Sequence, residues 1–194
     1  PEEVECDYLI LSHGHPDHVG DAAAIAERNG ATVIANFELA AFMERQGVET
    51  HPMHIGGAHV FPFGRVKLTI AHHGSGFPGE GGAFEYLGSP AGILLTAEDQ
   101  TFYHAGDTGL FLDMQLIGEL DQIDVAALPI GDNFTMGPAD AAKAVEFLKP
   151  ALAIPMHYGT WEVIAVDPRE FTSRVEAAGF QAAVPAIGES LEIG

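Results

Sequence analysis

Four side chains that can bind a metal ion fall within six consecutive positions of this chain, in the segment His13-Gly14-His15-Pro16-Asp17-His18. The segment directly follows an apolar run over residues 4–11 that predicts a β-strand. Clustered imidazoles repel one another when they are protonated, unless a cation or an acid fixes them. Gly14 and Pro16 let the backbone turn tightly between the donors. We therefore expect His13 and His15 to converge on one ion while Asp17 and His18 face a second.

Three more candidate ligands occupy equivalent places further along the chain. His73, Asp107 and His157 each follow an apolar run that predicts a strand. In α/β folds the residues just beyond the strand ends gather along one rim, where binding sites form. The seven donors are nitrogen and oxygen atoms, which suit zinc, manganese, iron or nickel. The carboxylate of Asp107 has two oxygens and could bridge a pair of ions.

Strand-like and helix-like segments alternate along the chain, which predicts an α/β architecture. The expected strands cover 4–11, 31–35, 65–71, 91–97, 101–104, 123–128 and 151–156, and the expected helices cover 21–29, 37–46, 111–120, 138–149 and a last helix from 168 that Gly179 stops. The first strand, helix and second strand form one βαβ unit. Residues 98–100 read as a hairpin turn, and Asp167-Pro168-Arg169-Glu170 reads as a capping box.

The stretch between residues 74 and 92 departs from this alternation. It holds seven glycines and two prolines, so we predict a long surface loop there. Neither a repeat nor a linker interrupts the chain. We therefore expect a single domain over residues 1–194, since a chain of this length commonly forms one core.

Composition limits the partners and the compartment. Acidic residues outnumber basic ones 28 to 8, and the resulting net charge of −20 disfavours nucleic-acid binding. No apolar run approaches the roughly 18 residues that a membrane span needs, and the acidic start is unlike a secretion signal. The single cysteine, Cys6, excludes an intrachain disulfide. We expect a cytoplasmic protein without a membrane or nucleic-acid partner, and homo-oligomer formation stays open.

These motifs are similar to those of the metallo-β-lactamase superfamily, whose signature is an HxHxDH segment followed by a spaced His, Asp and His. A small bacterial and archaeal family of metal-dependent hydrolases within it resembles this chain over essentially its whole length, in the segments 52–57 (PMHIGG), 73–76 (HGSG), 103–109 (YHAGDTG), 130–138 (IGDNFTMGP) and 155–158 (PMHY). The resemblance implies a four-layer αββα sandwich. Family members begin with a further segment of opening strands, and this sequence starts after them, so we expect the first sheet to lack those strands.

The resemblance also implies how the ligands divide. One metal ion would be bound by His13, His15 and His73, the second by Asp17, His18 and His157, and Asp107 would bridge the two. The family places its ligand directly before Gly-Ser, which favours His73 over its neighbour His72. Zinc or manganese is expected ahead of nickel or iron.

A pair of divalent ions held about 3.5 to 4 Å apart lowers the pKa of a shared water and leaves a hydroxide ready to attack. We therefore expect a binuclear hydrolase acting on a small ester, lactone or phosphodiester, and the positive site would attract an anionic substrate. Asp17 is the expected catalytic residue, because it could accept a proton as well as bind metal. No residue can yet be assigned to substrate binding.

Two other functions fit the same signature. A mononuclear iron sulfur-dioxygenase uses similar His and Asp ligands with one metal. A non-catalytic scaffold would keep only the fold, although all seven ligand positions are filled by competent residues. Nucleophilic catalysis by Ser12 or Ser75 is disfavoured, because neither lies in a GxSxG elbow.

The remaining histidines and loop residues have simpler expected roles. We expect His104 to be a packed, hydrogen-bonded residue and His51, His54 and His59 to be structural or at the surface. The loop residues Asn133, Thr135 and Ser75 could orient substrate or satisfy turn backbone.

Overall fold

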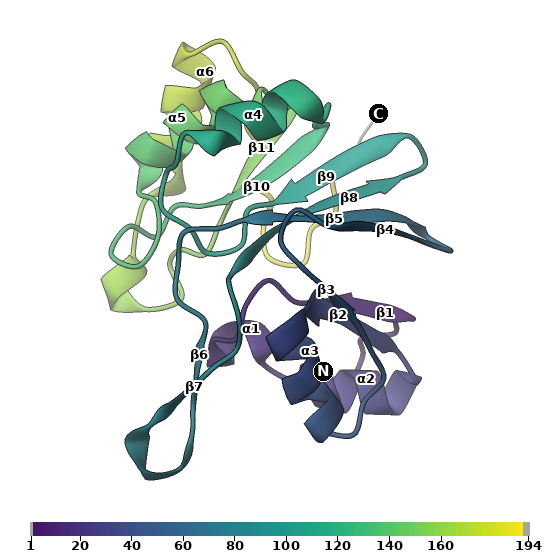
Figure 1. Ribbon diagram of the computed structural model, residues 1–194. Helices are drawn as coiled ribbons and strands as arrows, with labels where there is room; N and C mark the ends of the chain where they lie inside the picture. Colours follow the sequence, from purple (N-terminus) through teal and green to yellow (C-terminus); the bar gives the residue numbers. More distant parts are fainter. Residues whose placement is uncertain (1, 192–194) are drawn as a thin grey trace. The chain divides into compact units, whose positions relative to one another are not determined.

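The computed structural model describes residues 2–191, and the chain divides into two compact units. The first unit comprises the chain up to Ala58 together with Lys67–Gly92, and the second comprises His59–Val66 together with the chain from Ile93 onward. Each unit combines a β-sheet with helices (Figure 1), as the alternating sequence pattern predicts. The expected single domain over 1–194 stays a prediction.

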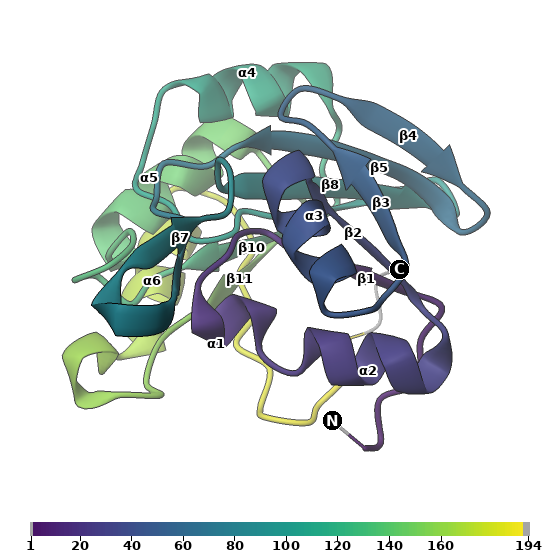
Figure 2. The same ribbon diagram turned by 60° about the horizontal axis from the view of Figure 1, so that its bottom comes forward.

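The first unit contains a three-stranded sheet with the order β1-β2-β3, and all three strands are parallel. Its elements are β1 (Tyr8–Ile10), α2 (Ala22–Asn29), β2 (Thr32–Asn36), α3 (Phe37–Arg45) and β3 (Thr50–Met53). The predicted βαβ unit is confirmed, because β1 and β2 pair in parallel on either side of α2. Both helices pack on the same face of the sheet, where they form a core with Val33 and Ala35 (Figure 2).

The ends of these helices follow the expected chemistry. Gly30 ends α2 in a left-handed conformation with φ 65°, which glycine adopts without steric cost. Asn36 caps α3, since its side chain accepts a hydrogen bond from the Leu39 backbone N–H at 2.9 Å. The predicted apolar stripe of α3 is buried, including Leu39 and Met43.

The second unit is built on a six-stranded sheet with the order β11-β10-β9-β8-β5-β4. Its strands are β4 (Ala58–Phe61), β5 (Gly64–Ile70), β8 (Ala91–Ala97), β9 (Gln100–His104), β10 (Val125–Pro129) and β11 (Leu152–Met156), and the unit boundary falls within β5 and β8. β9, β10 and β11 are parallel, so their carboxyl ends reach one edge of the sheet. The predicted hairpin is confirmed in β8 and β9, which are antiparallel and joined by Glu98 and Asp99, both at positive φ.

Three helices cover this sheet and supply half of the buried residues of its apolar core: α4 (Asp113–Leu120), α5 (Pro138–Leu148) and α6 (Pro168–Ala177). α5 contacts both α4 and α6 and lies between them in Figure 2. It begins with Pro138 at the favoured first position and ends at Leu148, and the following Lys149 has a left-handed φ of 52°.

The capping box predicted for α6 is only half formed. Asp167 caps the helix by accepting from the backbone N–H of Arg169 at 3.0 Å. Glu170, instead of completing the box, accepts a bond from Arg174 at 3.0 Å, one turn further along the helix. Two opposite charges at i and i+4 compete well with a capping role for Glu170.

The long loop predicted over 74–92 is wrong as a description of that segment. It contains a two-stranded antiparallel hairpin made of β6 (Gly76–Pro78) and β7 (Phe84–Tyr86), with the short 3₁₀ helix η1 (Glu80–Gly82) at its tip. Ser75 and Leu87 at the base of the hairpin are buried. Among the described residues, we find no helix that is both long and apolar enough to cross a bilayer.

Candidate metal centre

The loop that carries the first four predicted ligands begins where β1 ends. It is followed at once by α1 (Pro16–Val19), a single helical turn with Pro16 at its first position. The carbonyl of His15 accepts hydrogen bonds from the backbone N–H groups of His18 and Val19, at 3.0 and 2.9 Å. This turn folds the segment back on itself, so donors close in sequence are also close in space.

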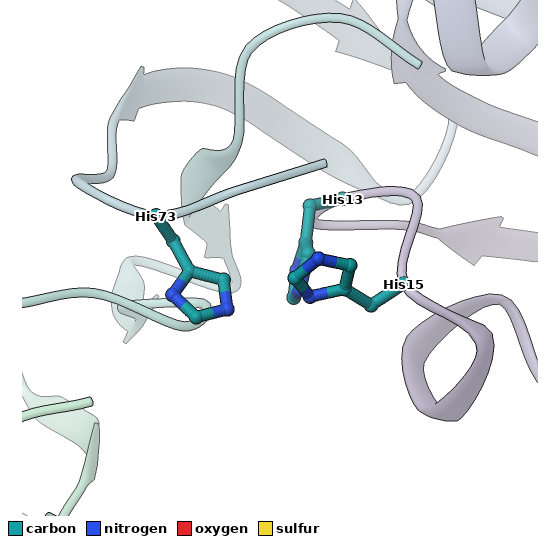
Figure 3. A group of neighbouring side chains, drawn as sticks. All are labelled: His13, His15 and His73. Carbon is teal, nitrogen blue, oxygen red and sulfur yellow. The ribbon is translucent and has the colours of Figure 1, made fainter. Parts of the chain in front are cut away.

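Three imidazoles of the first unit converge, as Figure 3 shows. One ring nitrogen from each of His13, His15 and His73 lies within 4.8 Å of the other two. The Nε2 atom of His13 is 3.0 Å from Nδ1 of His15. The ring centroids are 4.7 to 5.2 Å apart and the ring planes are nearly perpendicular, between 77° and 85°. His13 is fully buried and the other two are half-buried.

This donor set fits a divalent metal ion. Imidazole nitrogens are common zinc ligands at about 2.0 to 2.1 Å, so two of them on one tetrahedral ion would lie roughly 3.3 Å apart. The observed spread of up to 4.8 Å therefore needs only small ring rotations to close on an ion. A divalent ion bound between the three rings would account for their proximity.

Two glycines allow the histidines to approach so closely. A Cβ atom at Gly14 would lie 2.6 Å from Cβ of Leu87, a distance that real side chains do not reach. A Cβ atom at Gly74 would lie 3.3 Å from Nε2 of His15. Packing against Leu87 therefore requires the glycine of the HxHxDH motif, whereas a side chain at Gly74 would crowd the His15 ring and need a small shift.

Asp17 and His18 form a second pair of candidate ligands in the same unit. The Nε2 atom of His18 lies 3.6 Å from a carboxylate oxygen of Asp17. His18 is half-buried, whereas Asp17 is exposed. The hydroxyl of Ser12 lies 3.1 Å from Nδ1 of His13 and 3.4 Å from Nδ1 of His18. Ser12 thus contacts the back of both rings and can hold their orientation.

The second unit brings Asp107 and His157 together. The carboxylate of Asp107 lies 3.2 Å from Nε2 of His157, and both side chains are largely buried. Asp107 follows β9 and His157 follows β11, at the edge where the parallel strands end. An acid and an imidazole in contact offer one oxygen and one nitrogen donor to a metal ion.

The backbone at His157 is held in an uncommon conformation. Its φ is 53°, in the left-handed region that non-glycine residues rarely adopt. Gly131 packs against it, because a Cβ atom there would lie 2.4 Å from the His157 carbonyl oxygen. Strain of this kind is typical of functional sites. Burial raises the pKa of the neighbouring Tyr158 phenol, which stays neutral at physiological pH.

Other histidines lie apart from the groups of candidate ligands described above. His73, and not the exposed His72, joins His13 and His15. His104 is half-buried in β9, and its Nδ1 atom accepts a hydrogen bond from the Gly106 N–H at 3.1 Å. His59 lies at the surface and packs edge-on against Phe61.

Two of the loop residues for which the sequence left the role open are Asn133 and Thr135. Thr135 satisfies its own turn, where its hydroxyl donates to the Met136 carbonyl, and Asn133 is exposed. Asn36 was not singled out from the sequence, yet its amide donates to the carbonyls of Leu87 and Ser89 and holds the base of the β6–β7 hairpin. An Asn at the junction of a strand and a helix indicates only a cap, so its second contact has no local sequence signal.

Comparison with known proteins shows the family to which the chain belongs. Residues 1–158 match the model of the β-lactamase superfamily domain. The UPF0173 metal-dependent hydrolase of Geobacillus sp. (strain WCH70) is 62% identical over 172 residues, which cover 89% of this chain and 76% of the relative. That of Anoxybacillus flavithermus is 54% identical over 192 residues, covering 99% and 84%.

A solved structure extends the likeness to the fold. Igni18, described as a novel metallo hydrolase from the archaeon Ignicoccus hospitalis, is 36% identical and superposes with a TM-score of 0.88, covering 98% of this chain and 80% of that one. The expected α/β fold of metallo-β-lactamase type is confirmed. The chain belongs to the metallo-β-lactamase superfamily and, within it, to the UPF0173 group of metal-dependent hydrolases.

Proposed function

We propose that the protein is a binuclear hydrolase that acts on a small ester, lactone or phosphodiester. In this proposal His13, His15 and His73 bind one divalent ion, Asp17, His18 and His157 bind the other, and Asp107 binds both. Zinc and manganese are the preferred metals, followed by nickel and iron, since all the donors are nitrogen or oxygen. The convergence of the three imidazoles of His13, His15 and His73 carries the proposal.

The charge of the proposed site suits hydrolysis of an anionic substrate. Two divalent ions, when bound, supply a water molecule whose pKa is lowered toward neutrality and a positive charge for the substrate. The ligand set contains only two carboxylates, Asp17 and Asp107, so the site keeps a positive charge inside a protein of net charge −20. That contrast favours binding of an anionic substrate at this one place.

The residues of the chain have distinct tasks in the mechanism. Ser12 orients His13 and His18 through their Nδ1 atoms, so their Nε2 atoms would be the metal ligands. Asp17 is exposed and near His18, so its carboxylate can accept a proton during turnover. His157 follows β11 with a left-handed backbone, and its ring lies against the Asp107 carboxylate.

The test compares two neighbouring histidines. In His73→Ala one imidazole of the cluster is lost, and we expect metal content and hydrolysis of generic ester, lactone and phosphodiester substrates to fall together. In His72→Ala, the matched control, both should stay at the wild-type level. Elemental analysis of protein purified without added metal should give two ions per chain.

Three results would contradict the proposal. His73→Ala could keep the metal content and activity of the wild type. The wild type could hold one iron ion per chain and consume oxygen, which would favour a mononuclear dioxygenase. It could also bind two ions and hydrolyse none of the three substrate types.

A further inference from the structure

Ser75 lies at the junction of the two loops that carry the clustered histidines. It is two residues after His73 and is 4% exposed. Its hydroxyl oxygen accepts a hydrogen bond from the backbone N–H of Gly14 at 3.0 Å. Gly14 is the residue between His13 and His15, so a single hydroxyl connects the backbone of one ligand loop to that of the other.

The same hydroxyl also fixes the third segment at this junction. It donates to the carbonyl of Leu87 at 3.2 Å, and the Leu87 N–H donates back to the Ser75 carbonyl at 2.8 Å. Asn36 donates to the same Leu87 carbonyl at 3.0 Å. The Leu87 side chain, in turn, fills the space over Gly14. The hydroxyl of Ser75 therefore uses its donor and its acceptor at once, inside a closely packed junction.

We propose that Ser75 is a positioning residue that presets the separation of His73 from His13 and His15 for metal binding. The inference rests on the proposed function, because it assumes that these three imidazoles share an ion. Ser75 itself contacts no substrate or metal in this assignment. It acts only through the backbone of Gly14 and through its own place in the chain beside His73.

Loss of the hydroxyl has a clear physical consequence. The N–H of Gly14 would stay buried without an acceptor, which is costly, so the two loops would separate until water reached it. The imidazole nitrogens of His73, His13 and His15 would then no longer lie close enough to bind one ion. Residues that orient metal ligands typically contribute about 10- to 100-fold in metal affinity, and we expect a loss of that size for the first zinc equivalent.

The experiment measures zinc affinity by competition with a chromogenic chelator, for the wild type and three variants. Ser75→Ala should bind the first equivalent about 10- to 100-fold more weakly. Ser75→Thr, which keeps a hydroxyl, should recover most of the affinity. Ser89→Ala is the matched control, because Ser89 lies beside the same hairpin and its hydroxyl lies 3.4 Å from the Tyr86 hydroxyl. The zinc affinity of this variant should be unchanged.

A purely structural role would give a different pattern. In that case Ser75→Ala would lower the urea midpoint of the metal-free protein, while the folded fraction would bind zinc as tightly as the wild type, and this result would overturn the inference. If the wild type itself bound no zinc through these histidines, that result would contradict the proposed function and not only the role of Ser75. The two failures are therefore distinguishable.

A measurement on the wild type keeps the test valid even if Ser75→Ala does not fold. Hydrogen exchange of the Gly14 amide, followed by NMR in the metal-free protein, should be slow because the N–H is bonded and buried. Exchange at the rate of an unprotected amide would show that the hydroxyl does not hold the loop, and the inference would be wrong.

Discussion

The carboxylate of Asp107 lies 3.2 Å from Nε2 of His157, although the two residues are far apart in the sequence. They follow β9 and β11, which both pair in parallel with β10. Parallel pairing places the carboxyl ends of these strands at one edge, so only one strand separates the two loops. The contact follows directly from the strand order of the second unit.

Removing the charge of Asp107 tests its proposed role as a shared ligand. Asp107→Asn keeps the shape of the side chain but offers a weaker, neutral oxygen donor. We expect metal content to fall below two ions per chain and hydrolysis to fall by about 100-fold or more, as for the loss of a catalytic electrostatic group. Asp113→Asn, at an exposed position in the first turn of α4, is the control. Full activity and full metal content in Asp107→Asn would refute the assignment.

Gly14→Ala should damage both stability and metal binding. Its Cβ atom would lie 2.6 Å from Cβ of Leu87, so the loop must shift. Overpacking of this kind typically costs about 1–3 kcal/mol in the free energy of unfolding. Urea denaturation and zinc titration measure the two effects.

Gly109→Ala provides the matched control for this substitution. A Cβ atom at Gly109 meets nothing within 4 Å, and its φ lies outside the left-handed region. We expect its unfolding free energy to stay within a few tenths of a kcal/mol of the wild type or to rise slightly. Equal stability in the two variants would show that Leu87 yields to the added methyl group.

The HxHxDH segment and the residues at the strand ends made the candidate metal centre predictable from sequence. Each of these signals is local, since a ligand follows an apolar run in the same stretch of chain. The bond between Ser75 and Gly14 joins residues far apart in sequence, and no local pattern predicts such a partner. For the same reason Asn36 was missed, because its amide bonds reach Leu87 and Ser89.

The errors in secondary structure have similar causes. Glycines in residues 74–92 indicated a loop, yet β6 and β7 pair with each other and Leu87 is buried. β3 was not predicted, because it contains Pro52 and lies at the edge of its sheet, where a proline is tolerated. In both segments the strands form because they pair with other strands, and the local sequence does not show this pairing.

Asp167 should give helix α6 a pH-dependent stability. Hydrogen bonds from Arg169 lower the pKa of this carboxyl below its usual 3.8. Because the pKa of Asp167 is lower in the folded state, its carboxylate adds to the free energy of unfolding. This contribution is complete when the pH is above the pKa of the unfolded state. It is lost as the pH falls through the pKa of the folded state. In Asp167→Asn this contribution is absent at every pH.

The difference in unfolding free energy between the wild type and Asp167→Asn should therefore shrink as the pH is lowered from 6 toward 3. Urea denaturation at several pH values measures it. Glu176→Gln, near the other end of the same helix, controls for the general effect of removing a negative charge. A difference that stays constant over this range would show that the pKa of Asp167 is the same in both states.

Trp161 is the only tryptophan of the chain, and its ring lies 6.3 Å from the ring of His157. Its fluorescence should therefore report directly on metal bound by His157. We expect Ni²⁺ or Co²⁺, which quench nearby indoles, to reduce the emission in a saturable titration of the metal-free protein. His157→Ala should lose this quenching, while His59→Ala, at the surface of the same unit, should keep it. Quenching of equal size in His157→Ala would mean that the ion near Trp161 is held by other residues, and His157 would no longer be assigned as a ligand.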